Sequence, residues 1–388
     1  MSKNRIPYGW HQITDDDVAA VVDVMRHGQL AQGEQVALFE HELATCCGAA
    51  HGIACNSGSS ALLLACRALG LAPGQSLWTS ALTFVASASC ALHCGAEVDL
   101  LDIDPGTGNL SITTLKEKLW QARRAGRLPR VLVPVHYAGR PCDMEAIGAL
   151  AAEFGFAVIE DAAHALGATE LQDANSRIGN ARHSDAVAFS FHPVKLLTTG
   201  EGGMVMTNDP LLAERIARLR SHDIERPTDN GRADWRYRIR QPGYNLRLCD
   251  LQAALGCSQL RRIDSLLARR RALARRYHQR LGKTTLKLPP MDADEHCAWH
   301  LYWIACADAE ERQGLFDALH RAGIGAQVHY QPLYRLELFA HRGWRPEQFP
   351  GTEAFYAGAL SLPLFPDLSE TAQDEVMSLI EETLGLRA

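Results

Sequence analysis

Lys195 is the residue whose surroundings most suggest chemistry. It follows an apolar segment, Ala186–Phe191, and precedes the glycine-rich turn Thr198–Gly203. Apolar neighbours at the end of a strand would desolvate the amine, lower its pKa and leave a neutral nucleophile able to form an imine with a carbonyl group. A surface lysine lying along a sheet has the same local sequence, so the accompanying residues must decide its role.

An acidic residue, Asp161, ends another apolar segment, Ala157–Asp161. His164 follows three positions later. A carboxylate at this position can cap a helix, or it can keep the nitrogen of a pyridine ring protonated. A protonated ring is an electron sink, which is the property that a lysine-bound pyridine cofactor needs. If a helical turn begins at Asp161, His164 faces the same side and can contact the ring or its phenolic oxygen.

A glycine-serine turn, Asn56–Leu62, opens an apolar helical pattern. Its free N–H groups, the hydroxyls of Ser59 and Ser60 and the positive end of the helix dipole would suit a phosphate group, although Ser-Gly-Ser also serves as a plain helix cap. The turn matches neither the P-loop nor the dinucleotide-binding glycine pattern. Phe84 could stack on a planar ring or belong to the core.

These signals coincide at the ends of successive expected strands. The serine turn follows the first strand and Phe84 follows the second. Asp161 ends the fifth, while Ser190 and Lys195 lie at the end of the sixth. Ligands of open α/β sheets bind beyond the carboxyl ends of the strands. The residues would therefore surround one small phosphorylated heterocycle, and we predict that the cofactor is pyridoxal 5'-phosphate.

The elements that must position these residues alternate between strands and helices, which predicts an α/β fold with a mostly parallel sheet of seven strands. The expected strands are His51–Cys55, Ser76–Ser80, Glu97–Ile103, Arg130–His136, Ala157–Asp161, Ala186–Phe191 and Gly203–Asn208. The expected helices between them include Ser60–Leu69, Ser111–Arg124 and Met144–Phe154.

The pattern then changes to one long helix, Leu251–Leu281, whose many arginines we interpret as a solvated face. A smaller α+β region follows, with strands expected near His300–Cys306 and Ala326–Tyr330. We predict a large cofactor-binding domain, residues 1–255, and a small C-terminal domain, residues 256–388, with the boundary within or near the long helix.

Composition disfavours several classes of function. The chain has 388 residues and a formal net charge of −6, whereas nucleic-acid-binding proteins usually carry a basic excess. No apolar run approaches the roughly 20 residues that cross a bilayer, and the N-terminus lacks the apolar stretch of a signal peptide. Eleven scattered cysteines suggest buried thiols in a reducing compartment, and no His/Cys cluster has the spacing of metal ligands. We expect a cytoplasmic enzyme without a metal site.

Several stretches closely resemble the sugar aminotransferases of the DegT/DnrJ/EryC1/StrS family. They are Asn56–Leu62, Ile159–His164, Phe189–Gly203 and Gly243–Gly256. The resemblance runs over nearly the whole chain and implies a fold-type-I pyridoxal-phosphate enzyme, a homodimer whose active sites lie at the subunit interface. It implies that Lys195 is the imine lysine and that Asp161 is the partner of the pyridine nitrogen.

The same resemblance assigns the remaining cofactor contacts. His164 falls near the phenolic oxygen and Phe84 on the face of the ring. The implied phosphate ligands are Ser59, Ser60 and Ser190 from one subunit and Asn245 from its partner. A monomer would then have an incomplete active site.

Within the family, the chain is most similar to the C4 aminotransferases of the pseudaminic-acid pathway, through Pro134–Arg140 and His192–Lys195. This similarity implies a UDP-linked 4-keto-6-deoxy-N-acetylhexosamine as acceptor and L-glutamate as donor, which leaves as 2-oxoglutarate. The candidate substrate contacts are His192, Arg140, His329 and Tyr330.

The chain departs from that subgroup at Gln29–Ala31 and at Ala81–Leu82, which would lie near the substrate. Another nucleotide-linked 3- or 4-keto sugar therefore remains an alternative substrate. The related sugar 3-dehydrases carry a histidine where Lys195 stands, so the lysine argues against that reaction. A cofactor-bound regulator or DNA-binding protein is the alternative from a different class, but it would need a basic surface or a helix-turn-helix segment.

Overall fold

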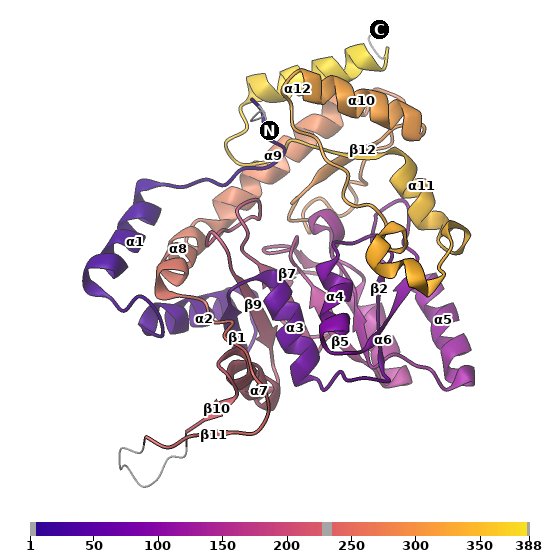
Figure 1. Cartoon of the computed structure of the whole chain (residues 1–388). Coiled ribbons are helices and arrows are strands. Elements are labelled where there is room, and N and C mark those ends of the chain that lie inside the picture. The colour runs from indigo at the N-terminus through magenta and orange to yellow at the C-terminus, as the bar shows by residue number, and fades with distance from the viewer. Residues whose placement is uncertain (1–4, 227–234, 386–388) are drawn as a thin grey trace.

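A seven-stranded sheet forms the centre of the computed structural model, which describes residues 5–226 and 235–385 (Figure 1). The strand order is β1-β9-β8-β5-β4-β2-β3; β9 runs antiparallel to both neighbours and the other pairs are parallel. The strands are β1 (His51–Cys55), β2 (Ser76–Ser80), β3 (Glu97–Leu101), β4 (Val131–Val133), β5 (Ala157–Asp161), β8 (Ala186–Ser190) and β9 (Gly203–Thr207). The predicted α/β fold with a mostly parallel sheet is confirmed, although β3 and β4 are shorter than expected.

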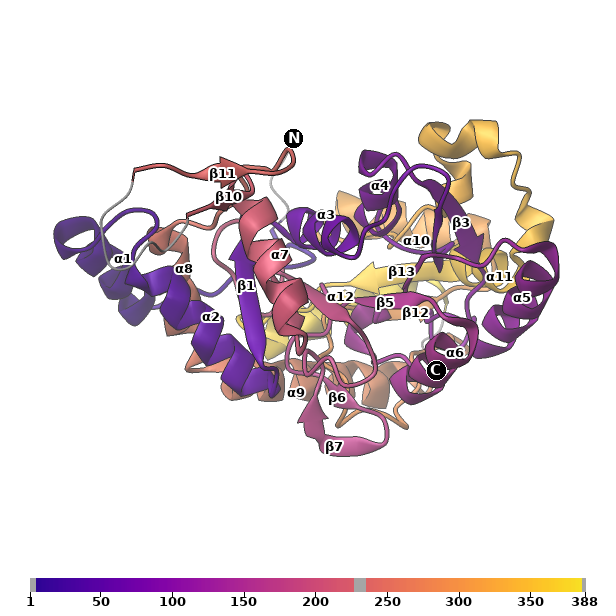
Figure 2. The ribbon, with the colours of Figure 1, turned by 90° about the horizontal axis from the view of Figure 1, so that it is seen from below.

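Alternating side chains of the strands serve two hydrophobic layers, one on each face of the sheet. In β8, Ala186 and Ala188 face one layer, while Val187 and Phe189 face the other. Helices cover both faces (Figure 2). The first face is covered by α3 (Gly58–Ala68), α4 (Ala86–His93) and α7 (Pro210–Arg220), and the second by α2 (Glu34–Cys47), α5 (Ile112–Ala125) and α6 (Met144–Phe154).

Polar caps start the helices where the chain leaves a strand or loop. Ser57, Ser111 and Asp143 each accept a backbone N–H of the first turn of α3, α5 and α6. Glycines in the left-handed conformation follow α5 and α6, at Gly126 and Gly155. The expected starts of α3 and α5 were therefore displaced by one or two residues around the caps, whereas α6 matches its expected range.

The long helix expected over Leu251–Leu281 is instead two helices, α8 (Asp250–Leu260) and α9 (Ile263–Leu281). They are separated at Arg262, whose guanidinium pairs with the buried carboxylate of Asp17 in α1 (Asp15–His27) and donates to the carbonyl oxygen of Gln12 at 3.0 Å. These contacts anchor Arg262 to the N-terminal segment. As a result, α8 stays packed against α1 and α2, while α9 turns toward the C-terminal region.

One arginine of α9 is buried rather than solvated, so the expected solvated face is wrong at this position. Arg270 is 1% exposed, and its Nη1 donates to the carbonyl oxygens of Trp299, His300 and Leu364. Backbone carbonyls here replace the water that a guanidinium otherwise binds. Other arginines of the helix pair with carboxylates, as in Arg275–Asp294, Arg276–Asp374 and Arg280–Glu381.

A further hydrophobic core lies in the C-terminal region, and α9 belongs to both cores. Leu267 packs in the core against the sheet, whereas Leu273 and Tyr277 pack in the C-terminal core. Ile6 also lies in the C-terminal core and pairs with Ile324. The boundary at 255/256 stays a prediction, but the change of core falls within α9 and the N-terminal segment packs with the C-terminal region.

The C-terminal region is built on a short antiparallel pair of strands, β12 (Tyr302–Ala305) and β13 (Ala359–Leu362). The strand expected at Ala326–Tyr330 is absent, because Gln327 makes only an isolated bridge with Ser361. Beyond it, the carbonyl oxygen of His329 accepts the hydroxyl of Tyr137 instead of continuing a ladder. The remaining helices of this region are α10 (Ala309–Arg321), η2 (Leu333–Arg335), η3 (Glu337–Arg342), η4 (Pro346–Gln348), α11 (Pro350–Gly358) and α12 (Glu370–Thr383).

Smaller elements complete the fold. They are η1 (Tyr137–Gly139), the pair β6 (Thr169–Glu170) and β7 (Asp173–Arg177), and the projecting pair β10 (Ile224–Glu225) and β11 (Arg238–Ile239). Within the described residues, the helices are too short or too polar to span a membrane, and no group of three metal-ligating side chains is found. The eleven cysteines are free, and most are buried.

Candidate active site

Lys195 lies in the turn between β8 and β9, at the carboxyl end of β8. Its backbone N–H donates to the carbonyl oxygen of His192 at 2.9 Å. Burial lowers the pKa of the Lys195 amine from 10.5 to about 8, and the negative charge of Asp161 partly opposes this shift. The neutral amine, which is the nucleophilic form, is therefore much more populated near neutral pH than in an exposed lysine.

Asp161 closes β5, the strand next to β8. Its Oδ1 accepts the N–H of Ala163 at 3.1 Å, and its Oδ2 accepts the hydroxyl of Ser87 at 2.7 Å. Ser87 lies in α4 and is fully buried, and its Oγ is 2.8 Å from Oγ1 of Thr83. The carboxylate is thus held from two sides and keeps lone pairs for a further donor, such as a protonated ring nitrogen.

The serine turn and Ser190 meet at the same edge of the sheet. A Cβ on Gly58 would lie only 2.7 Å from Cβ of Ser190, so the turn can approach β8 only with glycine at this position. Ser57 caps α3 by accepting the N–H of Ser60 at 3.1 Å. The N–H groups of Gly58 and Ser59 belong to the first helical turn and have no acceptor within the helix. With the helix dipole, they form a cradle suited to a phosphate.

The hydroxyl of Ser60 is engaged inside this turn. It donates to Oδ1 of Asn56 at 2.7 Å and lies 2.9 Å from Oγ of Ser57. Ser59 is exposed and lies in the first turn of α3, which forms the cradle itself. The roles of Ser59, Ser60 and Ser190 as phosphate ligands stay predictions.

His164 is held between two other aromatic side chains. Its Nε2 is 3.1 Å from the hydroxyl of Tyr330, and its ring lies 4.3 Å from that of His300. Burial lowers the pKa of His164 well below its ordinary value, so the ring is neutral. Its Nδ1 is buried and has no hydrogen-bond partner among the residues that the structure describes. A ligand oxygen could satisfy this nitrogen.

Phe84 is exposed over 54% of its surface, and its ring is tilted against that of Tyr330 at 5.8 Å. The exposure excludes the alternative that Phe84 is an ordinary core residue. An uncovered aromatic face at the carboxyl edge of the sheet suits a planar ligand.

The residues at this edge fit pyridoxal phosphate. Lys195 matches its carbonyl group and Asp161 its ring nitrogen. The first turn of α3 matches its phosphate, and the unpartnered nitrogen of His164 its phenolic oxygen. Four different groups of the protein would thus face four different groups of one small molecule.

The candidate substrate residues differ in their freedom to bind a ligand. Arg140 makes a bidentate ion pair with Asp292, at 2.8 and 2.9 Å, so its guanidinium is already engaged. His192 is exposed beside Lys195. His329 binds the hydroxyl of Ser361 through Nδ1 at 2.9 Å, and burial lowers its pKa to about 4. Their roles toward a sugar stay predictions, as does that of Tyr330.

Asn245 is exposed and lies next to the serine turn, Asn56–Leu62, of its own chain. Its backbone forms an isolated bridge with Ser221, and the following carbonyl, of Leu246, accepts the N–H of Asn56 at 2.9 Å. The side chain is therefore accessible to another molecule. Its contact with the phosphate of a partner subunit stays a prediction.

Sequence reasoning missed two residues of the site, Ser87 and His300, and gave no role to Thr83. Thr83 and Ser87 are four positions apart, a spacing that places side chains on one face of a helical turn. That signal could have grouped them, but nothing local shows that they face Asp161. No pattern in the sequence connects His300 with His164.

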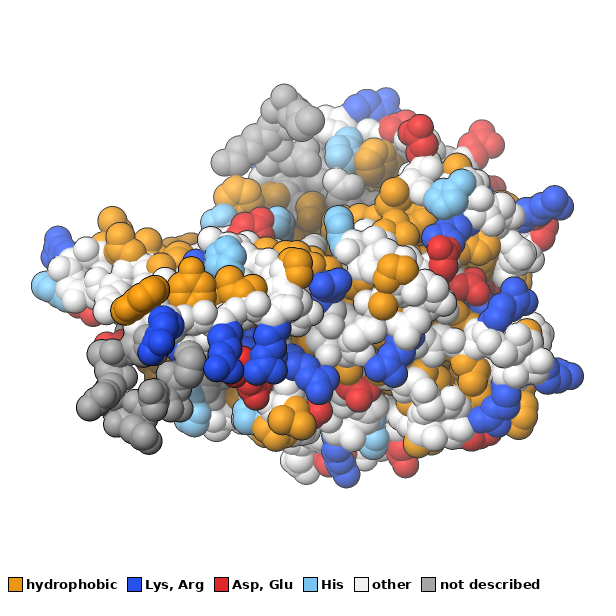
Figure 3. All heavy atoms as spheres, turned by 60° about the horizontal axis from the view of Figure 1, so that its bottom comes forward, with side chains coloured by type: hydrophobic (Ala, Val, Ile, Leu, Met, Phe, Trp, Pro, Cys, Tyr) orange, Lys and Arg blue, Asp and Glu red, His pale blue; other side chains and the backbone are white. Residues whose placement is uncertain are grey.

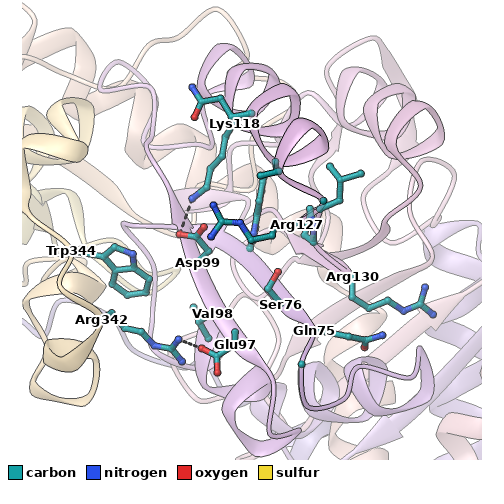
Figure 4. Close-up of a pocket in the computed structure, with 18 residues that line it drawn as sticks. Gln75, Ser76, Glu97, Val98, Asp99, Lys118, Arg127, Arg130, Arg342 and Trp344 are labelled. Carbon is teal, nitrogen blue, oxygen red and sulfur yellow. Dashed lines mark hydrogen bonds and ion pairs between the residues drawn. The ribbon is translucent and has the colours of Figure 1, made fainter.

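A separate surface cavity of about 740 Å³ lies at the opposite edge of the sheet, near the amino ends of β2 and β3 (Figure 4). Its charged side chains are largely paired with one another: Lys118 bonds to Asp99 at 2.7 Å, and Arg342 pairs with Glu97. None of the candidate cofactor or substrate residues lines it. The cavity is therefore not part of the active site.

We predict that the apoprotein attaches added pyridoxal phosphate faster as the pH rises, with a midpoint near 8. Only the neutral amine attacks a carbonyl, and the pKa of Lys195 is lowered from 10.5 to about 8, so the reactive fraction grows as the pH passes through this value. Stopped-flow absorbance over a pH series measures the rate. A midpoint near 10.5 would contradict the desolvation of Lys195.

A family model described as the DegT/DnrJ/EryC1/StrS aminotransferase family matches residues 11–381. The spore coat polysaccharide biosynthesis protein SpsC of Bacillus subtilis is 36% identical over 386 residues, which covers 97% of this chain and 96% of that protein.

Solved structures agree over nearly the full length. Helicobacter pylori PseC, an aminotransferase involved in the biosynthesis of pseudoaminic acid, superposes with a TM-score of 0.89 at 29% identity, over 98% of this chain and all of that chain. Streptococcus pneumoniae Spr1654 in its PLP form superposes with a TM-score of 0.88 at 27% identity, over 99% of both chains.

Proposed function

The chain belongs to the DegT/DnrJ/EryC1/StrS aminotransferase family, and from that membership we propose that it moves an amino group from L-glutamate to C4 of a UDP-linked 4-keto-6-deoxy-N-acetylhexosamine. Membership makes it a pyridoxal-phosphate-dependent sugar aminotransferase. The proposed products are 2-oxoglutarate and a UDP-4-amino-4,6-dideoxy-N-acetyl-β-L-altrosamine, an intermediate for pseudaminic acid. The reaction needs no oxidant, because an amino and a keto group change places.

The observation that carries the proposed chemistry is the placement of Lys195 and Asp161 at the ends of adjacent parallel strands. The lysine has a lowered pKa, and the carboxylate is fixed by Ser87 and Ala163. This pair matches the two ends of a pyridoxal ring that must be controlled together, the carbonyl and the ring nitrogen.

When bound, the cofactor supplies an electron sink for the negative charge that develops at Cα of the amino donor. Lys195 would hold the cofactor through its carbonyl group, and the Nζ of Lys195, once free, would take the proton from Cα of the donor. Asp161 would keep the ring nitrogen protonated. The first turn of α3 would hold the phosphate, and the neutral ring of His164 would hold the phenolic oxygen.

Similarity to PseC supports the choice of substrate. The departures from that subgroup at Gln29–Ala31 and Ala81–Leu82 are the features that favour a different sugar. Ala81 and Leu82 are buried, so this departure changes the packing behind Phe84 rather than a surface open to sugar. Gln29–Ala31 is exposed and could contact a ligand. Another nucleotide-linked 3- or 4-keto sugar is the second candidate substrate.

The test is a panel of UDP- and dTDP-linked 3-keto and 4-keto sugars, each incubated with the holoenzyme and L-glutamate. We expect the UDP-linked 4-keto-6-deoxy-N-acetylhexosamine to give the fastest release of 2-oxoglutarate, and NMR of the product to place the new nitrogen at C4. Faster turnover of a 3-keto or a dTDP-linked sugar would reject the proposed substrate and retain the aminotransferase.

We further propose a homodimer whose subunits share active sites. The pair β10–β11 forms an arm that projects from the body of the molecule (Figure 1). Exposed apolar side chains occur on the arm and on the N-terminal segment. Figure 3, which brings the bottom of the view in Figure 1 forward, shows apolar and basic side chains together on that face. The exposed apolar side chains include Met25, Leu30, Trp235, Tyr237 and Ile239. Exposed apolar surface of this kind supports a protein interface.

Mixed dimers test whether Asn245 acts on the partner's active site. Lys195→Ala and Asn245→Ala subunits, each inactive or weak as homodimers, are unfolded, mixed in equal amounts and refolded together. Half of the dimers would be mixed, and each would contain one complete site, so about one quarter of the wild-type turnover should return. Activity no higher than the mean of the two homodimers would show that Asn245 does not act across the interface.

A cytoplasmic location without a nucleic-acid or membrane partner is part of the same proposal. The net charge of −6 and the carboxylate-paired arginines of α9 support it against a DNA-binding role. Filter binding of duplex DNA at moderate salt is the direct check.

A further inference from the structure

We propose that Ser87 and Thr83 are positioning residues that act through Asp161 to keep the ring nitrogen of the cofactor protonated. This inference rests on the proposed function, because it concerns the carboxylate that would face the ring. Neither hydroxyl needs to touch the cofactor or the substrate. Their effect is carried by a chain of hydrogen bonds that ends on Oδ2 of Asp161.

The direction of this hydrogen-bond chain is fixed by its end. An ionised carboxylate only accepts, so the hydroxyl of Ser87 must donate to Asp161 at 2.7 Å. Ser87 has one hydroxyl hydrogen, and its contact with Thr83 at 2.8 Å must therefore be one in which Thr83 donates. Both hydroxyls point their positive ends toward the carboxylate, and hydrogen bonds in series strengthen one another.

Burial makes this arrangement effective. Ser87 and Thr83 are 0% and 2% exposed, and Asp161 is 6% exposed, so water cannot easily take the place of a lost hydroxyl. The N–H of Ala163 holds the other oxygen at 3.1 Å. Two donors, one on each oxygen, therefore hold the orientation of the carboxylate.

The same chain of bonds joins two sides of the ring site. Thr83 immediately precedes Phe84, whose exposed ring is the candidate stacking residue. Through Ser87, the loop after β2 is tied to the end of β5, although these strands are separated in the sheet by β4. The position of Phe84, the candidate stacking residue, is thus linked to the position of Asp161, the candidate partner of the ring nitrogen.

Two variants remove one hydroxyl each, and two more control for fold and volume. Ser87→Ala removes the direct donor, and Thr83→Val removes the second donor with little change of shape. Thr83→Ser restores the hydroxyl. Thr79→Val is a matched control, since the hydroxyl of Thr79 is also fully buried but donates to the carbonyl oxygen of Val133 at 2.8 Å.

The readout is the protonation of the ring nitrogen, followed by NMR of the holoenzyme carrying a cofactor labelled with the heavy nitrogen isotope. In Ser87→Ala, we expect the ring nitrogen to lose its proton at a lower pH than in the wild type, and the cofactor to dissociate about 10- to 100-fold more readily, as for a lost hydrogen bond to a charged group. Thr83→Val should shift the titration in the same direction by less. Thr83→Ser and Thr79→Val should titrate like the wild type.

Wild-type titration in both Ser87→Ala and Thr83→Val would overturn the proposal. If Ser87→Ala does not fold, the proposal is tested by comparing Thr83→Val with Thr83→Ser. Both variants change one small group, but only Thr83→Val removes the hydroxyl. Equal shifts in Thr79→Val and Thr83→Val would also overturn it, by showing a general packing effect. A wild-type holoenzyme that shows no lysine-bound cofactor absorbance would instead reject the proposed function, which separates the two failures.

Discussion

Replacing Lys195 with alanine is expected to abolish transamination together with the visible absorbance of the lysine-bound cofactor. Two functions are lost at once, the covalent attachment and the proton transfer at Cα. Loss of a positioned general base alone lowers a rate by roughly 10²- to 10⁴-fold. Because the same nitrogen is also the attachment point, we expect no measurable turnover in a coupled assay for 2-oxoglutarate.

Lys118→Ala is the control for this substitution. Lys118 is another partly buried lysine whose pKa burial lowers, but it lines the separate cavity and bonds to Asp99. We expect this variant to keep the cofactor absorbance and turnover. Transamination by Lys195→Ala, or loss of absorbance in both variants, would contradict the assignment of Lys195.

Replacing Asp161 with asparagine is expected to lower turnover by about 10²- to 10⁴-fold, since removing one partner of a buried ion pair costs about 3–5 kcal/mol. The amide keeps the size of the side chain but removes the charge that holds the ring nitrogen protonated. Lys195 remains, so covalent attachment and its absorbance should persist. The measurement is turnover per attached cofactor, which separates lost chemistry from lost binding.

Asp102→Asn provides the matched comparison. Asp102 is also buried, but its carboxylate accepts the N–H groups of Gly351 and Thr352 at the start of α11. We expect this variant to lose stability and to keep turnover per cofactor near that of the wild type. Equal turnover losses in both variants would show that Asp161 acts through the fold rather than through the ring.

The strand ends that carry the site could be predicted from the sequence because each is marked locally. Asp161 closes a short apolar run, and the Ser-Gly-Ser turn opens a helix, so the ends of β1 and β5 were placed correctly. Parallel strands then bring their carboxyl ends to one edge whatever their order. Local pattern and sheet geometry together explain why the residues expected to surround one ligand do lie at one edge.

Features that depend on distant partners could not be predicted in this way. The interruption at Arg262 arises from a carboxylate 245 positions away, at Asp17. The burial of Arg270 depends on backbone carbonyls in two later segments. Likewise, Ser87 is 74 positions from Asp161, and its hydroxyl reaches this carboxylate only because α4 packs near β5. Tertiary contacts, rather than propensity, decide all three.

The membership of α9 in both hydrophobic cores has a consequence for how the protein unfolds. Leu267 and Tyr277 lie on one uninterrupted helix, so a cut between them leaves each fragment with an unfilled apolar interior. Ile6 extends this interdependence, because the first described residues help to fill the core built by the last third of the chain. We therefore expect the two regions to unfold as one cooperative unit. Heat or denaturant should melt them in a single transition, and neither region should survive limited proteolysis without the other.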